Sequence, residues 1–379
     1  MKIGIITFWQ SQDNYGQILQ CWALQHFLMS IGHDAYLIRY THTNPKPLLK
    51  EQLKKILKVY PVLKKILNLL CIKKKSLQIV FHQRCFDDFK NKNIKQSSIV
   101  YRNLSDLQRK PPQADCYIVG SDQVWAQLLY TSNNETYFLN FGDEKIKRIS
   151  YAASFAMEDY PQKMRQRLAK QLQRFDAISV REKSGVRICD SVGVKAELVL
   201  DPTFLLGREF YMRFITVNRS DNYVFFYVLN INGPEDIYWE QLSSFFQSQQ
   251  YKMIVTTASG FNQISFELKD CIYEYPTIEQ WLSLIYNSAL VVTTSFHGVA
   301  LSIKLNKPFL FIPLSGHYAG SNNRVLDLLD ALGLSERVIY NAFECKSRMG
   351  KAIMWDEVNI KLDKLIESSR FFLTKNLKS

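Results

Sequence analysis

Three short polar motifs with residues that could do chemistry each follow an apolar run of the kind that forms a buried strand. They are Asp13-Asn14-Tyr15-Gly16, Gly120-Ser121-Asp122-Gln123-Val124-Trp125 and Thr293-Thr294-Ser295-Phe296-His297-Gly298. A glycine at the start of a helix lets backbone N–H groups approach an anion closely. His297 is the strongest catalytic candidate, because an imidazole titrates near neutrality and can give or take a proton.

The first motif could bind an anion, and the second holds side chains that could bind a sugar. Asn14 and Gly16 open an expected helix, and Ser121 and Asp122 follow an expected strand. Asp122 could orient a sugar hydroxyl, and Trp125 could stack on a sugar face. The alternative for each motif is an ordinary helix cap, with the tryptophan in the core.

Two arginines occupy similar places in the sequence. Arg181 ends the run AISVR, and Arg324 follows the polar loop SGHYAGSNN and opens a helix. The rigid fork of donors on arginine suits carboxylate and phosphate groups, although a surface salt bridge is the commoner role of a single arginine. Two more residues could line a binding cleft together with these arginines. They are Ser295, close to His297, and His317, in the polar loop before Arg324.

Alternating strands and helices must position these residues. Apolar runs predict strands at residues 2–8, 34–40, 117–120, 148–155, 177–181, 223–229, 252–256, 290–294 and 308–312, and helices at 15–31, 162–175, 186–192, 234–249, 278–287, 299–305 and 324–332. This alternation predicts parallel sheets, whose ligands bind beyond the carboxyl ends of the strands. We expect an α/β fold of two Rossmann-like domains, 1–205 and 206–354, facing a cleft. A helix at 355–379 would pack back on the first domain.

Composition excludes several classes of protein. The chain has 379 residues, 47% hydrophobic and 22% charged, so it is neither disordered nor fibrous. Seven scattered cysteines without a CxxC pair favour a reducing compartment over a zinc ribbon or a disulfide framework. Without a signal sequence or a long apolar run, the prediction is a cytoplasmic protein. P-loop, GxGxxG, HExxH and GxSxG motifs are absent, so we expect no metal and no cofactor.

The positive charge is concentrated in one segment. Residues 46–75 carry ten lysines against one acid, Glu51, while the whole chain has a net charge of +13. Leu and Ile recur there at helical spacing, and Pro61 divides the run into two short amphipathic helices. Such helices suit an anionic membrane surface, and a solvated helical face is the alternative. Nucleic acid is disfavoured because arginine and interleaved aromatics are missing.

Taken together, the motifs resemble the polysaccharide pyruvyl transferase family from about Ile3 to Arg337. The matching pieces are DNYGQILQCWALQHFL, VGSDQVW, SYAASFA, ISVREKSG, LVLDPTFLL, VVTTSFHGVALSIKLNKPFLFIP and NNRVLDLLDALGL. The resemblance implies an architecture similar to the glycosyltransferase B fold. It also implies transfer of pyruvate from phosphoenolpyruvate onto two hydroxyls of a sugar, which forms a cyclic ketal and releases phosphate without a metal.

The resemblance also implies roles for individual residues. His297 inherits the place of the family's catalytic histidine, and Arg181 and Arg324 inherit the arginines that hold the anions of phosphoenolpyruvate. On the acceptor side, Asp122 is a candidate base and Asn14 a candidate ligand.

The sequence departs from the family's pattern beside the histidine and within an insertion at about 45–90. Ser295 stands where some members carry Arg, and Thr294 where many carry Asp. The resemblance suggests a pathway that makes a capsule or another surface polysaccharide. If the acceptor in such a pathway is an oligosaccharide on polyprenyl diphosphate, the basic insertion would hold the enzyme at the inner face of the membrane. The alternatives are a nucleotide-sugar-dependent glycosyltransferase of the same shape and a non-catalytic carbohydrate-binding protein.

Overall fold

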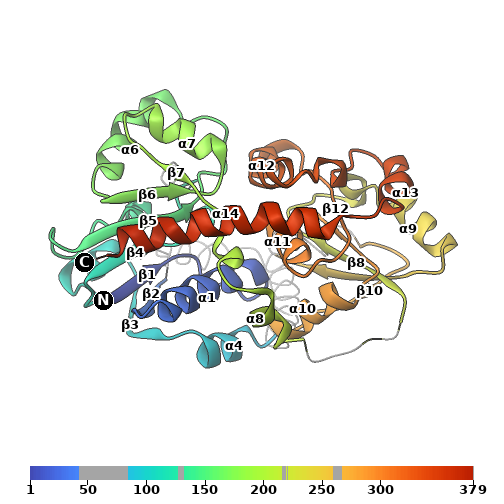
Figure 1. Ribbon diagram of the computed structural model, residues 1–379, viewed down its shortest axis with the longest axis horizontal. Helices are drawn as coiled ribbons and strands as arrows, with labels where there is room; N and C mark the ends of the chain where they lie inside the picture. Colours follow the sequence, from blue (N-terminus) through green and yellow to red (C-terminus); the bar gives the residue numbers. More distant parts are fainter. Residues whose placement is uncertain (42–83, 127–131, 216–218, 220, 259–266, 379) are drawn as a thin grey trace, which may run out of the picture.

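Two parallel β-sheets, each flanked by helices, form the molecule (Figure 1). The computed structural model describes residues 1–41, 84–126, 132–215, 219, 221–258 and 267–378. The basic segment 46–75, predicted as two amphipathic helices, lies outside these residues. Within them, no helix is long and apolar enough to cross a bilayer.

The first sheet follows the strand order β3-β2-β1-β4-β5-β6-β7, with every described pair parallel. Its strands are β1 (Lys2–Ile6), β2 (Asp34–Tyr40), β3 (Gln96–Tyr101), β4 (Cys116–Val119), β5 (Lys147–Ala153), β6 (Ala177–Val180) and β7 (Glu197–Leu198). Its helices and 3₁₀ turns are α1 (Tyr15–Ser30), α4 (Phe86–Asn93), α5 (Leu104–Arg109), η2 (Ser132–Phe138), η3 (Gln162–Met164), α6 (Arg165–Leu172) and α7 (Lys183–Asp190).

The second sheet follows the order β10-β9-β8-β11-β12 and is also parallel. Its strands are β8 (Tyr223–Val228), β9 (Lys252–Thr257), β10 (Ile272–Tyr273), β11 (Leu290–Thr293) and β12 (Phe309–Phe311). The connecting η4 (Pro202–Phe204) and α8 (Arg208–Met212) lead into it. The other helices and turns are η5 (Pro234–Ile237), α9 (Trp239–Ser248), α10 (Ile278–Asn287), α11 (Phe296–Lys304), η6 (Gly316–Asn322), α12 (Asn323–Leu332), η7 (Ser335–Arg337) and α13 (Phe343–Met349).

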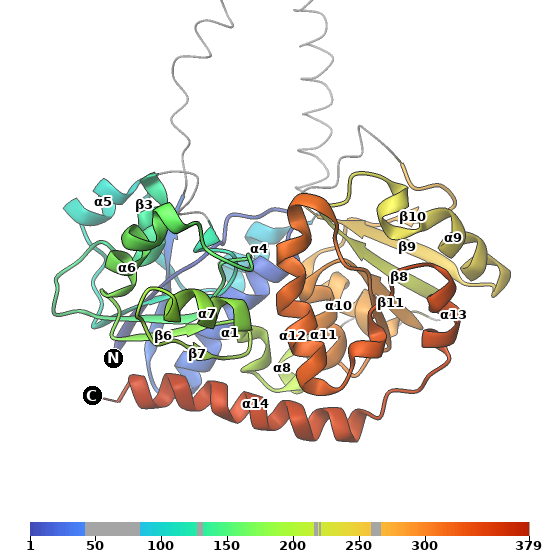
Figure 2. The same ribbon diagram turned by 90° about the horizontal axis from the view of Figure 1, so that it is seen from above.

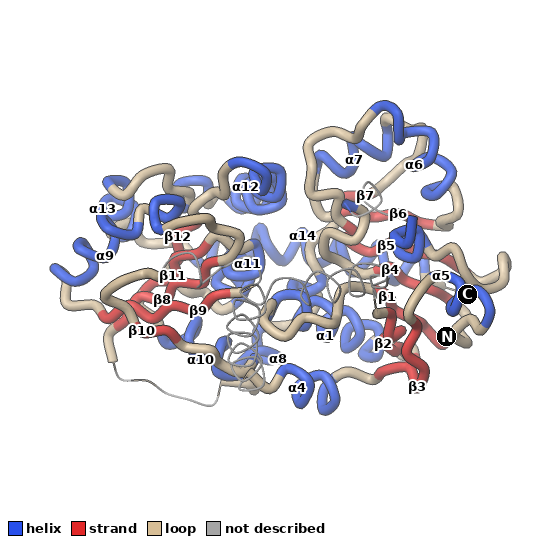
Figure 3. Tube along the Cα trace, turned by 180° about the vertical axis from the view of Figure 1, so that it is seen from behind, coloured by secondary structure: helices blue, strands red, loops and turns tan. Residues whose placement is uncertain are grey.

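Burial on both faces explains the continuous apolar strands. All six residues of β8 are buried, as expected of a parallel strand covered by helices on each side. Figure 3 shows the two sheets side by side with helices around them. The sheets therefore direct the carboxyl ends of β1, β4, β8 and β11 toward the space between them, where the loops that follow these strands line one cavity.

The last helix, α14 (Trp355–Asn376), runs along both halves of the molecule (Figure 2). The Ser369 hydroxyl accepts a hydrogen bond from Leu200 N at 2.9 Å, and Lys147 Nζ donates to the carbonyl of Asn376 at 3.0 Å. Phe372 and Leu373 are buried in the same core cluster as the strands of the first sheet. The C-terminal helix thus returns to the first sheet after the second is complete.

The structure differs from the sequence-based expectation at several elements. Helix α11 begins at Phe296 rather than at residue 299, because the Ser295 side chain caps it by accepting from Gly298 N. Helix α4 and strand β3 were not expected. Phe86 and Phe89 of α4 are buried in the main core, so the C-terminal end of the expected insertion is part of the folded body.

Candidate active site

A polar cavity of about 170 Å³ lies where the carboxyl ends of strands from both sheets meet. It is lined from the first half by Phe8, Asn14, Gln17, Asp122 and Gln123, and from the second half by Leu229, Asn230, Thr294, Ser295, Phe296, His297, Leu314, Tyr318, Ser321, Arg324 and Val325. Predicted residues from three separate motifs therefore share one cavity. This cavity is the candidate active site.

His297 lies in the first turn of α11 because the end of β11 turns sharply into the helix. The Thr293 hydroxyl donates to the carbonyl of Tyr227 at 2.6 Å and accepts from Ser295 N at 3.0 Å. These bonds fix the turn between strand and helix, and Ser295 then caps the helix. The His297 side chain is 7% exposed and lines the cavity.

Gly16, in the first turn of α1, packs directly against the His297 ring. A Cβ added at Gly16 would lie 2.6 Å from the Cβ of His297 and closer still to the ring atoms Nδ1 and Cγ. Because ordinary contact begins near 3.4 Å, only glycine fits here without displacing the imidazole. The glycine brings the start of α1, with Asn14 as its cap, beside the candidate catalytic group.

Asp201 is the buried centre to which the candidate residues converge. Its Oδ2 accepts from Arg181 Nη1 at 2.6 Å and from Ser121 Oγ at 2.8 Å, and His297 Nε2 lies 3.7 Å away. Its Oδ1 accepts from the backbone N–H and the hydroxyl of Thr203 at 3.0 and 2.8 Å. Burial opposes ionisation, but His297, Arg181 and the Thr203 N–H together hold the pKa of Asp201 well below its ordinary value.

Arg181 fills only part of its donor capacity through this ion pair. Its side chain is 1% exposed, and Nη2 lies 3.7 Å from Asp122 Oδ1. Within the described residues, Nε and Nη2 of Arg181 have no hydrogen-bond partner, and neither has Nε2 of His297. Buried polar groups are normally satisfied, so the two unpaired guanidinium nitrogens of Arg181 are suited to an anion.

Arg324, at the start of α12, borders the cavity from the second half. With the Gln123 amide oriented so that its oxygen faces the guanidinium, Nη1 and Nη2 of Arg324 donate to it at 3.1 and 3.0 Å. Burial and the nearby charge of Arg181 lower the pKa of Arg324 to about 10. The Phe296 ring lies near both arginines, with its centroid 4.7 Å from Cζ of Arg181 and 5.7 Å from Cζ of Arg324.

Glu182 adds a second buried carboxyl next to Arg181. Its Oε1 accepts from the backbone N–H groups of Phe155 and Ala156 at 2.8 and 3.3 Å. Burial raises the pKa of Glu182, against the opposing effect of Arg181 and the Phe155 N–H. The carboxyl therefore favours the protonated form more than an exposed glutamate does.

Two residues that line the cavity have left-handed backbone. Asp122 has φ 84° and Asn230 has φ 58°. This conformation is costly for residues other than glycine, and such strain is often retained at functional sites. Here it turns the chain away from β4 and β8 just where their ends reach the cavity.

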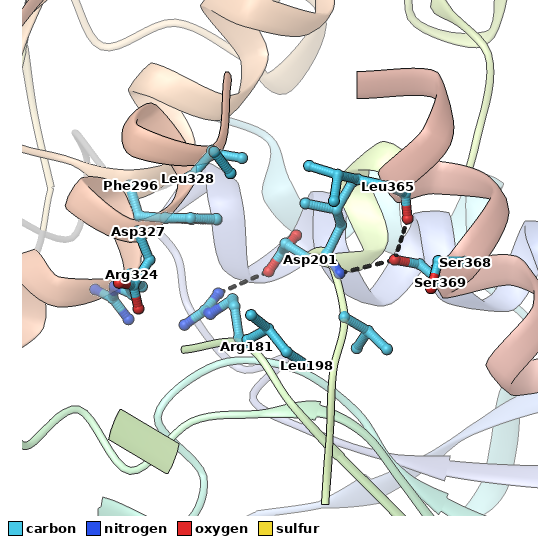
Figure 4. A pocket seen from close by; sticks show the side chains of 13 residues that line it. Arg181, Leu198, Asp201, Phe296, Arg324, Asp327, Leu328, Leu365, Ser368 and Ser369 are labelled. Atoms are coloured by element: carbon cyan, nitrogen blue, oxygen red, sulfur yellow. Dashed lines mark hydrogen bonds and ion pairs between the residues drawn. The ribbon is translucent and has the colours of Figure 1, made fainter. Parts of the chain in front are cut away.

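A smaller, mostly apolar pocket of about 90 Å³ lies behind the cluster, between β7, α12 and α14 (Figure 4). Arg181, Asp201, Phe296 and Arg324 form one end of it. Arg181 lines this rear pocket and not the front cavity, whereas Arg324 lines both. The side chains of His297, Arg181 and Arg324 therefore do not all line one cavity, although the sequence had suggested that they would. His297 and Arg324 line the front cavity, and Arg181 lies behind them.

The structure does not bring every predicted residue to the cavity. Trp125 is fully buried, stacks on Phe138 with ring centroids 5.4 Å apart and donates to the Tyr137 carbonyl, so it is a core residue and offers no face to a sugar. Ser121 is also fully buried and reaches Asp201 instead. His317 lies in η6, beside the cavity residue Tyr318, but its side chain is outside what the structure describes.

Sequence reasoning missed Asp201, Gln123 and Glu182 as individual residues. All three lie within motifs on which the family resemblance rests, LVLDPTFLL, VGSDQVW and ISVREKSG. Asp201 lies shortly after the last strand of the first sheet, which ends at Leu198, and an acid in that position was the available signal. Among the residues that the structure describes, no group of three or more His, Cys, Asp or Glu side chains could hold a metal ion.

Two parallel α/β halves that face one cavity at the ends of their strands define the glycosyltransferase B type of fold. Solved structures share it: UDP-N-acetylglucosamine 2-epimerase from Rickettsia bellii has a TM-score of 0.53 at 10% identity, covering 100% of this chain and 99% of that chain. UDP-GlcNAc 2-epimerase from Methanocaldococcus jannaschii, in complex with UDP-GlcNAc and UDP, has a TM-score of 0.51 at 12% identity, covering 93% of this chain and 94% of that chain. At these identities the likeness concerns the fold alone.

Residues 14–316 match the polysaccharide pyruvyl transferase family. The chain therefore belongs to this family of transferases, as the order of its motifs predicted. No curated protein matches the sequence significantly. The matched range includes Gly16, Arg181, Asp201 and His297, so most of the cluster belongs to the part of the chain that the family shares, while Arg324 follows it.

Proposed function

We propose that the chain transfers the enolpyruvyl group of phosphoenolpyruvate onto two hydroxyls of a sugar, forming a cyclic pyruvate ketal and releasing phosphate. The observation that supports this most directly is the convergence of His297, Arg181 and Arg324 within one buried cluster at the cavity. Phosphoenolpyruvate carries a carboxylate and a phosphate, and one guanidinium group at the polar cavity with a second directly behind it suits such an anion.

Arg324 is the first candidate to hold the donor, because it lines the cavity and its Nε is unpaired among the described side chains. Arg181 contributes positive charge from behind, and its Nη2, which makes no hydrogen bond to any described residue, lies 3.7 Å from Asp122 Oδ1. Each charge-assisted hydrogen bond to the donor is worth roughly 1.5–3 kcal/mol. The polar side chains Asn14, Ser295 and Asp122 remain for the sugar.

The reaction balances without a cofactor. His297 gives a proton to the methylene carbon of phosphoenolpyruvate, which makes the adjacent carbon electrophilic. A sugar hydroxyl attacks that carbon, the C–O bond to phosphate breaks, and a second hydroxyl closes the ketal. One hydroxyl proton returns to His297 in place of the one it gave, and the other leaves on the phosphate. Asp122 is the candidate base that takes the proton of the attacking hydroxyl and passes it on to the departing phosphate.

The acceptor that we propose is a sugar of a surface polysaccharide or of its lipid-linked precursor. An oligosaccharide on polyprenyl diphosphate would present its sugar at the inner face of the cytoplasmic membrane. The ten lysines of residues 46–75 support attraction to an anionic surface there, at about 1 kcal/mol for each lysine close to the lipid. Loss of flotation with anionic vesicles on deleting 46–75 is the expected result, and flotation unchanged by the deletion contradicts it.

The direct test incubates the protein with phosphoenolpyruvate and an acceptor glycan. We expect phosphate release together with the mass gain of a pyruvate ketal on the glycan. His297→Ala should lower turnover by at least about 100-fold while the far-ultraviolet circular dichroism is retained. Release of a nucleotide from a sugar nucleotide, with no reaction of phosphoenolpyruvate, would instead favour the glycosyltransferase alternative.

A further inference from the structure

The backbone on both sides of Asp201 is held by helix α14. Before Asp201, the Ser369 hydroxyl accepts from Leu200 N at 2.9 Å (Figure 4). After it, Arg370 donates through Nε and Nη2 to the carbonyl of Leu205 at 3.0 and 2.6 Å. Adjacent residues of one helix therefore hold the two ends of the short segment 200–205. These two contacts, Ser369 with Leu200 and Arg370 with Leu205, together form a clasp.

This segment is also anchored from within the two halves. Tyr151 of β5 donates to the Leu200 carbonyl at 3.1 Å, and Lys304 of α11 donates to the Phe204 carbonyl at 3.4 Å. Lys304 belongs to the same helix that carries His297 in its first turn. The segment that presents Asp201 is thus tied to the first sheet, to α11 and to α14 at once.

Asp201 transmits this placement to the cavity. Its carboxylate holds Arg181 at 2.6 Å and faces His297 Nε2 at 3.7 Å, and the side chain is fully buried. A displaced carboxylate would change the position of the guanidinium and the environment of the imidazole together. Misplacement of a catalytic group by about 1 Å can cost roughly 100-fold in rate.

We propose that Asp201, Ser369 and Arg370 are positioning residues for the reaction, and that α14 acts on the site through the segment 200–205. The proposal rests on the proposed function for its rate measurements. It assigns the C-terminal helix, which lies beyond the residues matched by the family, a part in the chemistry as well as in the fold.

The experiment is a double-mutant cycle in the full chain. S369A/R370Q removes both ends of the clasp, and we expect kcat to fall about 10-fold. K375Q is the matched control, because it removes another contact of α14 with the first sheet, the exposed Lys375–Glu197 ion pair of 2.8 Å. We expect K375Q to keep kcat within about twofold of the wild type.

The cycle is completed with Asp201→Asn. In that background S369A/R370Q should change kcat by less than about twofold, because its route to the site has already been removed. Equal losses in both backgrounds would overturn the proposal, since α14 would then act only on general stability. The variant S369A/R370K keeps a donor for the Leu205 carbonyl and should therefore turn over faster than S369A/R370Q. Equal rates of these two variants count against the clasp.

A second readout does not depend on the reaction. In protein labelled at its six histidines, the His297 ring resonances are assigned by comparison with His297→Ala. S369A/R370Q should shift them, and K375Q should not. If phosphoenolpyruvate is not a substrate, or Asp201→Asn does not fold, this comparison decides alone. Ring resonances that stay at their wild-type positions in S369A/R370Q overturn the proposal.

Discussion

Replacement of Gly16 by alanine tests the packing at the centre of the candidate site. The new Cβ would lie 2.6 Å from the Cβ of His297 and nearer to its ring, where ordinary contact begins at 3.4 Å. The ring or the start of α1 must therefore retreat by about 1 Å. A shift of that size at a proton donor costs roughly 100-fold in turnover.

Stability should change far less than turnover. Overpacking costs about 1–3 kcal/mol, but alanine is about 1 kcal/mol better than glycine inside a helix. We therefore expect Gly16→Ala to lower the free energy of unfolding by about 0–2 kcal/mol, measured by urea denaturation. A loss of rate without a matching loss of stability would separate a displaced imidazole from an unfolded protein.

The assay measures ketal formation from phosphoenolpyruvate in Gly16→Ala and in a control, Gly350→Ala. At Gly350 the nearest atom to an added Cβ is 3.7 Å away, so alanine fits there. In a His297→Ala background, Gly16→Ala should cost less stability, because the two ring atoms nearest to the added Cβ, Nδ1 and Cγ, are absent. The reasoning is refuted if Gly16→Ala turns over at the wild-type rate and is as stable as the wild type.

Three further substitutions test the charges of the buried cluster and its support, each by urea denaturation across pH. Asp201→Asn breaks the buried pair with Arg181 and should cost about 3–5 kcal/mol at pH 7; because the pKa of Asp201 is lowered, this difference should shrink as the pH falls below 3.8. Burial raises the pKa of Glu182 above 4.5, so Glu182→Gln should gain stability over the wild type as the pH rises above that value. Burial and the charge of Arg370 lower the pKa of Lys304 to about 8, so Lys304→Met should be stabler by about 2–3 kcal/mol at pH 7, with the gain fading between pH 8 and 10.5. Unchanged pH profiles would contradict each of these.

Much of the fold could be predicted because a parallel sheet buried on both faces leaves a continuous apolar signal. Strand β2 and helix α10 have the predicted bounds, and β8 is one residue shorter than predicted. Strand β3 was missed because it lies at the edge of its sheet, where only Tyr101 of its residues is buried and the others are partly or fully exposed. The short β7 was not among the predicted strands, because it has only two residues and both are exposed.

The candidate site could be predicted only where a residue carries its own chemical signal. His297 and Arg324 stand beside glycine or polar loops at strand-to-helix turns, and the cavity includes both. Trp125 follows the same kind of turn, yet it points into the core, because the direction of a side chain depends on packing that the sequence does not display. Asp201 was missed because its role depends on partners far along the chain.

That dependence explains why one carboxylate can organise the cluster. Ser121 follows β4, Arg181 follows β6 and His297 follows β11, so the three groups that face Asp201 come from the ends of strands in two separate sheets. Parallel topology brings such ends together only when both sheets are complete and their edges face each other. Asp201 lies on the chain segment that leaves the first sheet for the second. It is therefore placed where a single acid can contact groups from both sheets, and any motion of one half against the other must change its contacts.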